Sequence, residues 1–423
     1  MLPRLTDLPV DFALGMYALL RPSLLVIALL ASTPAFADSV DRDCSKGAAE
    51  QRIPACTQLL DRQMAKSTKA LVFYRRGQAY AETGDDNKAV DDFGAALDLR
   101  PRDTATLTAR ADAQARLGHA DAALADYTGA IALDRRSSLP LVNRGFALLQ
   151  FDRNQDAITD FDAAIALNAR DEEAWKGRGD AHRALEEHMA AIDDYTQAIR
   201  IDKTYKNAFY ARARSLIEMK DYTRAEEDLQ KALDLDPDFD SAFFSRGYVE
   251  WQLGDTEAAI ADYTKALALD TDFPAARLER GQLFASLHRY DEAMADYDET
   301  IREMPSNDQA YVSRGIVWRE LGDYDNALAD LTKAMSLKSG DADTLNERAR
   351  TYLAADRYDE ALTDANAAIA AQATVPDYFI TRAKIHEAKS ERDAAIADLS
   401  KALELDPGSK PAKGGLSRLG ATP

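Results

Sequence analysis

DSAFFSRGYVEWQLGDTEAAIADYTKALALDTDF, residues 240–273, is the stretch that decides the fold. Its 34-residue frame, laid over the chain in both directions without a gap, gives ten consecutive copies from Ala70 to Ser409. Within each copy, apolar residues recur at three- and four-residue spacing over two stretches of about thirteen residues, which is typical of two amphipathic helices joined by a turn. The period therefore predicts an array of stacked helix pairs.

Three positions of the repeat, numbered as slots 1 to 34 from its first residue, carry small side chains. Slot 8 is Gly or Ala, slot 20 is Ala in all ten copies, and slot 27 is Ala except at Thr300. Small side chains let helix axes approach closely, and larger neighbours fill the layer between them. The aromatic residues at slot 24 are Phe93, Tyr127, Phe161, Tyr195, Tyr263 and Tyr297. We interpret this aromatic stripe as core and not as a cofactor site.

These slots resemble the tetratricopeptide repeat family over residues 70–409. The resemblance implies an all-α, right-handed superhelical solenoid of about ten helix-turn-helix repeats, in which the first helix of each pair lines an inner, concave face. Residues 38–69 are then expected to form an N-terminal capping segment, because the spacing of Ala55, Cys56, Leu59 and Leu60 follows the second half of a repeat. Residues 410–423 are expected to form a short C-terminal cap or tail.

The N-terminus predicts export. Arg21 precedes the apolar run 24–31, and the small-residue pattern Ala35-Phe36-Ala37 follows, so residues 1–37 are interpreted as a signal peptide removed after Ala37. An uncleaved membrane anchor is the alternative, and Met16 is an alternative start to Met1. We expect no membrane insertion after signal removal, and a location in the periplasm. The stretch RIPACTQLL and its cysteines also resemble exported repeat proteins of Gram-negative bacteria.

The sequence contains two cysteines, Cys44 and Cys56. In an exported protein, a pair spaced this closely is most simply a disulfide. Two free thiols, or half of a metal site, are the competing interpretations, although the segment has no His to complete such a site.

Charge and motifs exclude several classes of function. A formal net charge of -20 argues against nucleic acid, because phosphate binding needs clustered Lys and Arg. The motifs GxGxxG, GxSxG and HExxH and the Walker loop do not occur, and the five histidines are dispersed. We therefore expect no enzyme activity, no cofactor and no metal.

Two slots depart from the usual pattern of the family in every copy. Slot 7 is Arg and slot 23 is Asp in all ten repeats. In a helical hairpin that turns near slot 15, these two slots lie at about the same height on facing helices. We therefore predict one Arg/Asp pair per repeat, forming a ladder beside the core. Ten arginines aimed at an anionic ligand are the alternative, which the accompanying aspartates disfavour.

The function is sought on the inner face, which the resemblance assigns to slots 2, 5, 9, 12 and 13. Proteins of the family that grip chaperone C-termini use Lys and Asn there, but slot 5 offers only Lys176 as a basic residue and slot 9 contains no Asn. These slots carry instead a run of large apolar side chains. The candidate partner-binding residues are Val142, Phe146, Leu149, Tyr210, Phe244, Tyr248, Trp251, Leu278, Val312 and Ile316.

Two functions fit this face. The first is a non-catalytic periplasmic interaction scaffold that binds a protein or peptide in the concave groove, since Trp and Tyr are favoured anchors of binding. The second is a carbohydrate-handling module, such as a periplasmic chaperone or guide for polysaccharide export, because aromatic rings also stack on an oligosaccharide. The sequence leaves open whether these side chains are exposed or packed between neighbouring helices.

Overall fold

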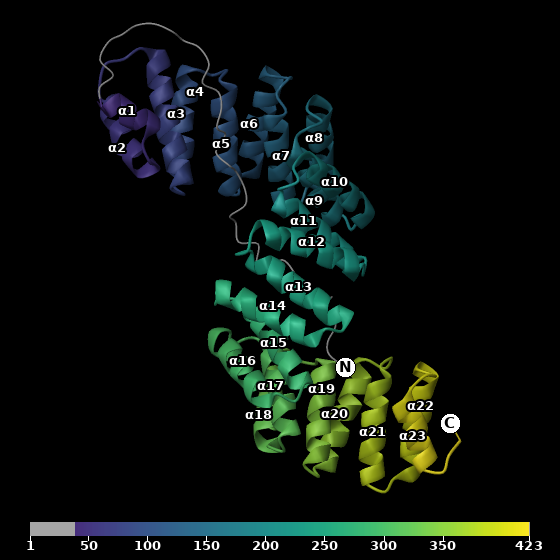
Figure 1. The fold of residues 1–423 in the computed structure, drawn as a ribbon. Coiled ribbons are helices and arrows are strands. Elements are labelled where there is room, and N and C mark those ends of the chain that lie inside the picture. The colour runs from purple at the N-terminus through teal and green to yellow at the C-terminus, as the bar shows by residue number, and fades with distance from the viewer. Residues whose placement is uncertain (1–38, 423) are drawn as a thin grey trace. The chain divides into compact units, whose positions relative to one another are not determined.

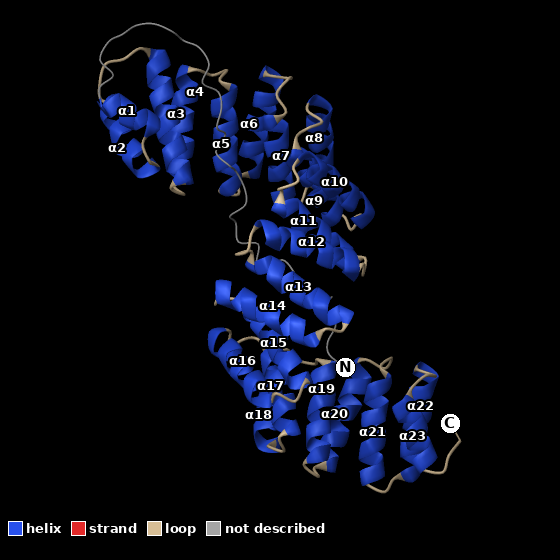
Figure 2. Cartoon of the chain, viewed as in Figure 1, coloured by secondary structure: helices blue, strands red, loops and turns tan. Residues whose placement is uncertain are grey.

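The computed structural model describes residues 39–422, so the expected signal at 1–37 lies outside the described part of the chain. This part consists of helices joined by short loops, and Figure 2 shows no strand in it. The chain divides into two compact units, with the boundary between Pro101 and Arg102. Each unit is described by itself, and the continuity of the array across this boundary stays a prediction of the sequence.

The described part of the first unit, residues 39–101, holds four helices and includes the first of the ten repeats. They are α1 (Ser39–Lys46), α2 (Ala49–Leu60), α3 (Lys66–Glu82) and α4 (Asp86–Leu99).

The second unit holds the other nine repeats and one additional helix (Figure 1). Its helices are α5 (Thr104–Arg116), α6 (Ala120–Leu133), α7 (Leu139–Gln150), α8 (Asn154–Leu167), α9 (Glu172–Ala184), α10 (His188–Ile201), α11 (Lys206–Glu218), α12 (Tyr222–Leu235), α13 (Asp240–Leu253), α14 (Thr256–Leu269), α15 (Pro274–Ser286), α16 (Tyr290–Glu303), α17 (Asp308–Glu320), α18 (Tyr324–Leu337), α19 (Ala342–Ala354), α20 (Tyr358–Ala371), α21 (Pro376–Ala388), α22 (Arg392–Leu405) and α23 (Lys410–Arg418). Each odd-numbered helix from α5 to α21 packs against the even-numbered helix that follows, and the two form one repeat.

The sixth repeat, residues 240–273, shows why each pair forms where it does. Helix α13 ends at Gly254, whose φ of 94° is the left-handed conformation that glycine adopts without a steric penalty. Helix α14 then begins after Asp255, whose carboxylate accepts a hydrogen bond from the Ala258 N–H at 3.0 Å. A Cβ atom added at Gly247 would lie 2.9 Å from the Tyr263 ring, so the small slot 8 is required for the close approach of the two helices.

The lead-in is more complete than the expected incomplete repeat. Residues 39–60 form two helices, α1 and α2, and α2 packs on α3 of the first repeat. Cys44 and Cys56 are both fully buried and are joined in a disulfide between α1 and α2. Leu59 and Val72 pack against them, so this small core includes the first repeat.

At the other end, α23 contributes Ala412 and Leu416 to a core cluster with Leu399, and Leu419 packs beside it. This helix covers apolar surface of the last repeat, as expected of a terminal cap. Across residues 39–422, no helix is long and apolar enough to cross a membrane.

Candidate functional site

The predicted ladder is confirmed by the hydrogen bonds of all ten repeats. In the sixth repeat, Arg246 donates from Nε to Oδ2 of Asp262 at 2.6 Å and from Nη2 to Oδ1 at 2.8 Å. The other nine pairs repeat this two-pronged geometry, with distances from 2.6 to 2.9 Å throughout. The aspartates are buried, and the hydrogen bonds that Arg246 donates to Asp262 raise the pKa of Arg246.

The same arginines also tie neighbouring repeats together, which the sequence interpretation missed. Arg246 donates its third nitrogen, Nη1, to Oε1 of Gln230 at 2.6 Å, and Gln230 stands at slot 25 of the preceding repeat. Slot 25 carries an oxygen acceptor in each of these links. The corresponding pairs in the second unit are Arg144–Thr128, Arg178–Asp162, Arg212–Thr196, Arg280–Thr264, Arg314–Asp298, Arg348–Thr332 and Arg382–Asn366. The ladder therefore holds the fold together and is not available to an anionic ligand.

The candidate partner-binding residues all lie on odd-numbered helices of the second unit, but none is fully exposed. Three of them, Val142, Leu278 and Val312, are buried. These three side chains pack beneath the surface and are not accessible to a partner. The half-buried ones are Phe146, Leu149, Tyr210, Phe244, Tyr248, Trp251 and Ile316.

The aromatic members pack partly on one another and partly on the core. The Phe244 ring centroid lies 5.5 Å from that of Tyr263 and 4.9 Å from that of Phe273. The Tyr248 centroid lies 6.0 Å from that of Trp251. Phe244 is thus largely a packing residue, whereas Tyr248 and Trp251 form a ring pair at the edge of the sixth-repeat core.

Polar contacts show that slot 6 also belongs to this surface, because it meets slot 9 of the preceding repeat. Asn143 at slot 6 donates to the carboxylate of Asp112 at slot 9 at 3.1 Å. Arg350 at slot 9 donates to Thr381 at slot 6 at 3.2 Å. We call the surface made by slots 2, 5, 6, 9, 12 and 13 of the odd-numbered helices the first-helix face. The sequence interpretation left out slot 6, and with it several charged groups.

The carboxylates on the first-helix face differ in the hydrogen-bond donors and positive charges that offset their negative charge. Asp112 accepts from Tyr127 and Asn143, yet burial outweighs these donors and raises its pKa to about 6. Glu347 is held by two arginines, Arg319 at 2.6 Å and Arg350 at 2.9 Å. Local pairing therefore satisfies most of the charge on this face.

Glu279, at slot 6 of α15, is a buried carboxylate that lacks such compensation. Its side chain is 7% exposed, and none of residues 39–422 gives its carboxylate a hydrogen bond or an ion pair. Burial alone raises its pKa to about 7. Gln282, one turn further along α15, is 8% exposed and likewise has no partner in the described chain.

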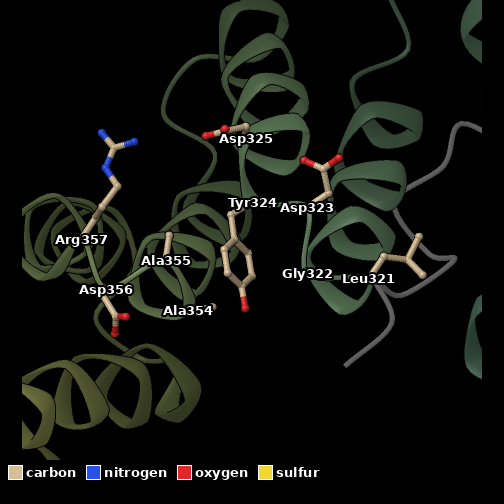
Figure 3. A pocket seen from close by; sticks show the side chains of 9 residues that line it. All are labelled: Leu321, Gly322, Asp323, Tyr324, Asp325, Ala354, Ala355, Asp356 and Arg357. Atoms are coloured by element: carbon tan, nitrogen blue, oxygen red, sulfur yellow. The ribbon is translucent and has the colours of Figure 1, made fainter.

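A shallow, open depression of about 570 Å³ lies elsewhere, between the turns of the eighth and ninth repeats (Figure 3). Its polar side chains form hydrogen bonds and ion pairs within the two turns. Asp323 caps α18 by accepting from the Asn326 N–H, and Arg357 pairs with Glu360 at 2.9 Å. We therefore do not regard it as a binding site.

Sequence comparison agrees with this helical repeat scaffold. Family profiles described as tetratricopeptide repeat match residues 70–103, 143–205, 210–276, 250–308, 278–342, 319–385 and 376–409. The chain belongs to the tetratricopeptide repeat family. Proteins of this family are in general non-catalytic scaffolds for protein–protein interaction. No curated protein matches the sequence.

Several solved structures are similar to part of the chain. The MamA structure is 25% identical, covers 38% of this chain and 94% of its own, and has a TM-score of 0.37. PilW, described as a type IV pilus biogenesis factor, is 20% identical over 50% of this chain and 98% of its own, with a TM-score of 0.47. A tetratricopeptide repeat protein from Parabacteroides merdae is 20% identical over 59% of this chain and 98% of its own, also with a TM-score of 0.47. These likenesses concern the fold alone.

Proposed function

We propose that the protein is a non-catalytic scaffold, exported to the periplasm, whose first-helix face binds an extended segment of a protein partner in a concave groove. The observation that carries this proposal is the half-buried ring pair of Tyr248 and Trp251 on that face. Rings that already rest on a core lose little side-chain freedom on binding, so burying their remaining surface is favourable. The other half-buried apolar residues extend the surface to both sides along the array.

The experiment is a peptide array probed with residues 38–423 of the protein. Trp251→Ala is expected to weaken binding by about tenfold or more, as for a central aromatic anchor. Trp175→Ala is the matched control, because Trp175 is also half-buried but lies at slot 4, where its indole donates to the Ala169 carbonyl at 3.1 Å. Equal loss of affinity in both variants would show that the first-helix face is not the binding surface.

The second candidate, carbohydrate handling, is favoured by the same ring pair, because two aromatic faces at neighbouring positions suit a sugar ring. An oligosaccharide array tests it directly. Saturable sugar binding that Trp251→Ala abolishes, without binding to any peptide, would replace the first proposal with the second.

Export is tested separately. A precursor expressed in a Gram-negative host is expected to yield a periplasmic protein that begins at Asp38, as read from its intact mass. Recovery of a protein that retains residues 1–37 would contradict the cleavage.

A further inference from the structure

Glu279 is a buried charged group on the first-helix face that no residue among 39–422 neutralises. The arginines of its own helix are committed elsewhere: Arg277 bonds Glu303 and the Thr271 carbonyl, and Arg280 bonds Asp296 and Thr264. A buried carboxylate without a counter-charge is costly to the fold, so its presence needs a reason.

The surroundings of Glu279 are aromatic. Burial raises the pKa of Tyr248, Tyr263 and Tyr297, and the charge of Glu279 adds to the increase in each, so these three phenols lie within electrostatic reach of its carboxylate. Tyr248 is 31 residues before Glu279, the same separation that brings Asp112 to Asn143 and Arg350 to Thr381. Glu279 therefore adjoins Tyr248, and Tyr248 in turn adjoins Trp251.

The carboxylate also keeps a path to solvent. Five side-chain atoms in residues 39–422 are both sealed from solvent and without a partner, and no atom of Glu279 or Gln282 is among them. Both residues lack a protein partner, so their polar atoms retain some access from outside. A ligand can therefore reach a carboxylate and an amide placed one helical turn apart.

We infer that Glu279 is the anchor for a cationic side chain, Lys or Arg, carried by the bound segment. Gln282 offers its amide oxygen to the same cation, and the ring faces of Tyr248 and Trp251 flank it. A carboxylate removed from water binds an ammonium or guanidinium group strongly, and aromatic faces also attract cations. The net charge of -20 favours encounter with a basic partner. This inference rests on the proposed function, since it specifies what the first-helix face recognises.

The test uses residues 38–423 of the protein and four pools of heptapeptides whose central residue is Lys, Arg, norleucine or Glu. We expect the Lys and Arg pools to bind about tenfold more tightly than the norleucine pool, as one charge-assisted contact provides. Glu279→Gln is expected to abolish this preference, leave norleucine binding unchanged, and raise the thermal stability of the free protein. A purely structural glutamate would not combine lost recognition with gained stability.

Glu347→Gln is the matched control, because Glu347 occupies the same slot but is already paired with Arg319 and Arg350. It is expected to lower stability and to leave the preference for basic pools intact. If the Lys and norleucine pools bind equally while Trp251→Ala weakens both, the cation site is wrong and the proposed function stands. If no pool binds, both are wrong.

Discussion

Eight of the ladder arginines, from Arg144 to Arg382, use all three guanidinium nitrogens, two within their own repeat and one across to the preceding repeat. Arg246 is 17% exposed and Asp262 is 9% exposed at the side chain, so this ion pair is largely removed from water. Removing one partner of such a pair leaves the other charge buried and uncompensated, which is more costly than losing an exposed pair. The ladder is therefore a place where single substitutions have large effects.

Asp262→Ala is expected to lower the free energy of unfolding around α13 and α14 by about 3 to 5 kcal/mol. Hydrogen exchange measures this locally, which suits an array whose repeats need not unfold together. Asp272→Ala is the control, because Asp272 is exposed in the following loop. A similar loss of protection in both variants would mean that the buried pair adds nothing beyond a surface contact.

Glu279 gives the protein a pH dependence whose sign follows from its environment. Burial raises the carboxyl pKa from 4.5 to about 7, so the folded chain holds a proton that the unfolded chain releases between these values. Stability is thus lost as pH rises from 4.5 to about 7. Glu279→Gln is expected to be more stable than the natural chain by about 3 kcal/mol at high pH and nearly equal to it at about pH 4. Urea unfolding of both proteins across this range measures the gap, and a gap that does not change with pH would contradict the assignment.

At the scale of the element, the turns between paired helices depend on one left-handed residue at slot 15. Glycine occupies this position at Gly84, Gly118, Gly254 and Gly322. The other six repeats hold the same conformation with Asp152, Glu186, Lys220, His288, Asp356 or Ser390, at φ from 56° to 65°. A side chain with a Cβ atom is disfavoured there, so these six turns are strained.

Lys220→Gly is expected to stabilise its repeat by about 0.5 kcal/mol, because relief of strain exceeds the added freedom of the unfolded chain. Gly254→Ala is expected to destabilise its repeat by about 1 kcal/mol, for the opposite reason. Gly414→Ala serves as the control, since Gly414 is helical and has no atom within 4 Å of an added Cβ, so alanine there should be tolerated or stabilising. Thermal unfolding of the three variants measures their stabilities relative to the natural chain. A loss of stability in Lys220→Gly would argue against strain at slot 15.

The disulfide acts on the lead-in element. Reduction of Cys44–Cys56 is expected to lower the stability of residues 39–101 by up to about 3 kcal/mol, because α1 and α2 then lose their covalent link. Hydrogen exchange with and without reductant localises the effect. Repeats from Thr104 onward should keep their protection, and a double Cys→Ser variant should not respond to the reductant. Loss of protection throughout the chain on reduction would contradict this localisation.

For the whole molecule, the sequence predicted what repeats in every copy. The Arg246–Asp262 pair follows from two slots that are identical in all ten copies, and the Gly247 contact with Tyr263 follows from slots that are small and mostly aromatic, respectively. Contacts between repeats were harder to predict, because slot 25 varies among Thr, Asp, Gln, Asn, Ser and Gly, and its linked members share only an oxygen acceptor. The sequence pattern likewise gave no sign that Lys220 adopts the left-handed conformation that Gly254 adopts at the same slot.

The candidate site depended on features that do not repeat, and these were only partly predictable. Whether Phe244 or Trp251 is packed or open depends on neighbouring side chains that differ from copy to copy. Glu279 is one of many acidic residues in the sequence, and its charge alone did not distinguish it. Its burial and its missing partner are properties of the three-dimensional surroundings, which the period of the repeat does not encode.

The link through slot 25 has a consequence for how such a chain can change its length. Excision of residues 206–239 would bring Arg246 to Thr196, which already accepts a hydrogen bond from Arg212 at 2.9 Å. If one whole repeat from the third to the ninth were lost or duplicated, the arginine at the new junction would again meet an oxygen acceptor at slot 25 of the preceding repeat. Unequal recombination within the gene can therefore add or remove whole repeats without breaking the ladder, and can in this way change the length of the first-helix face.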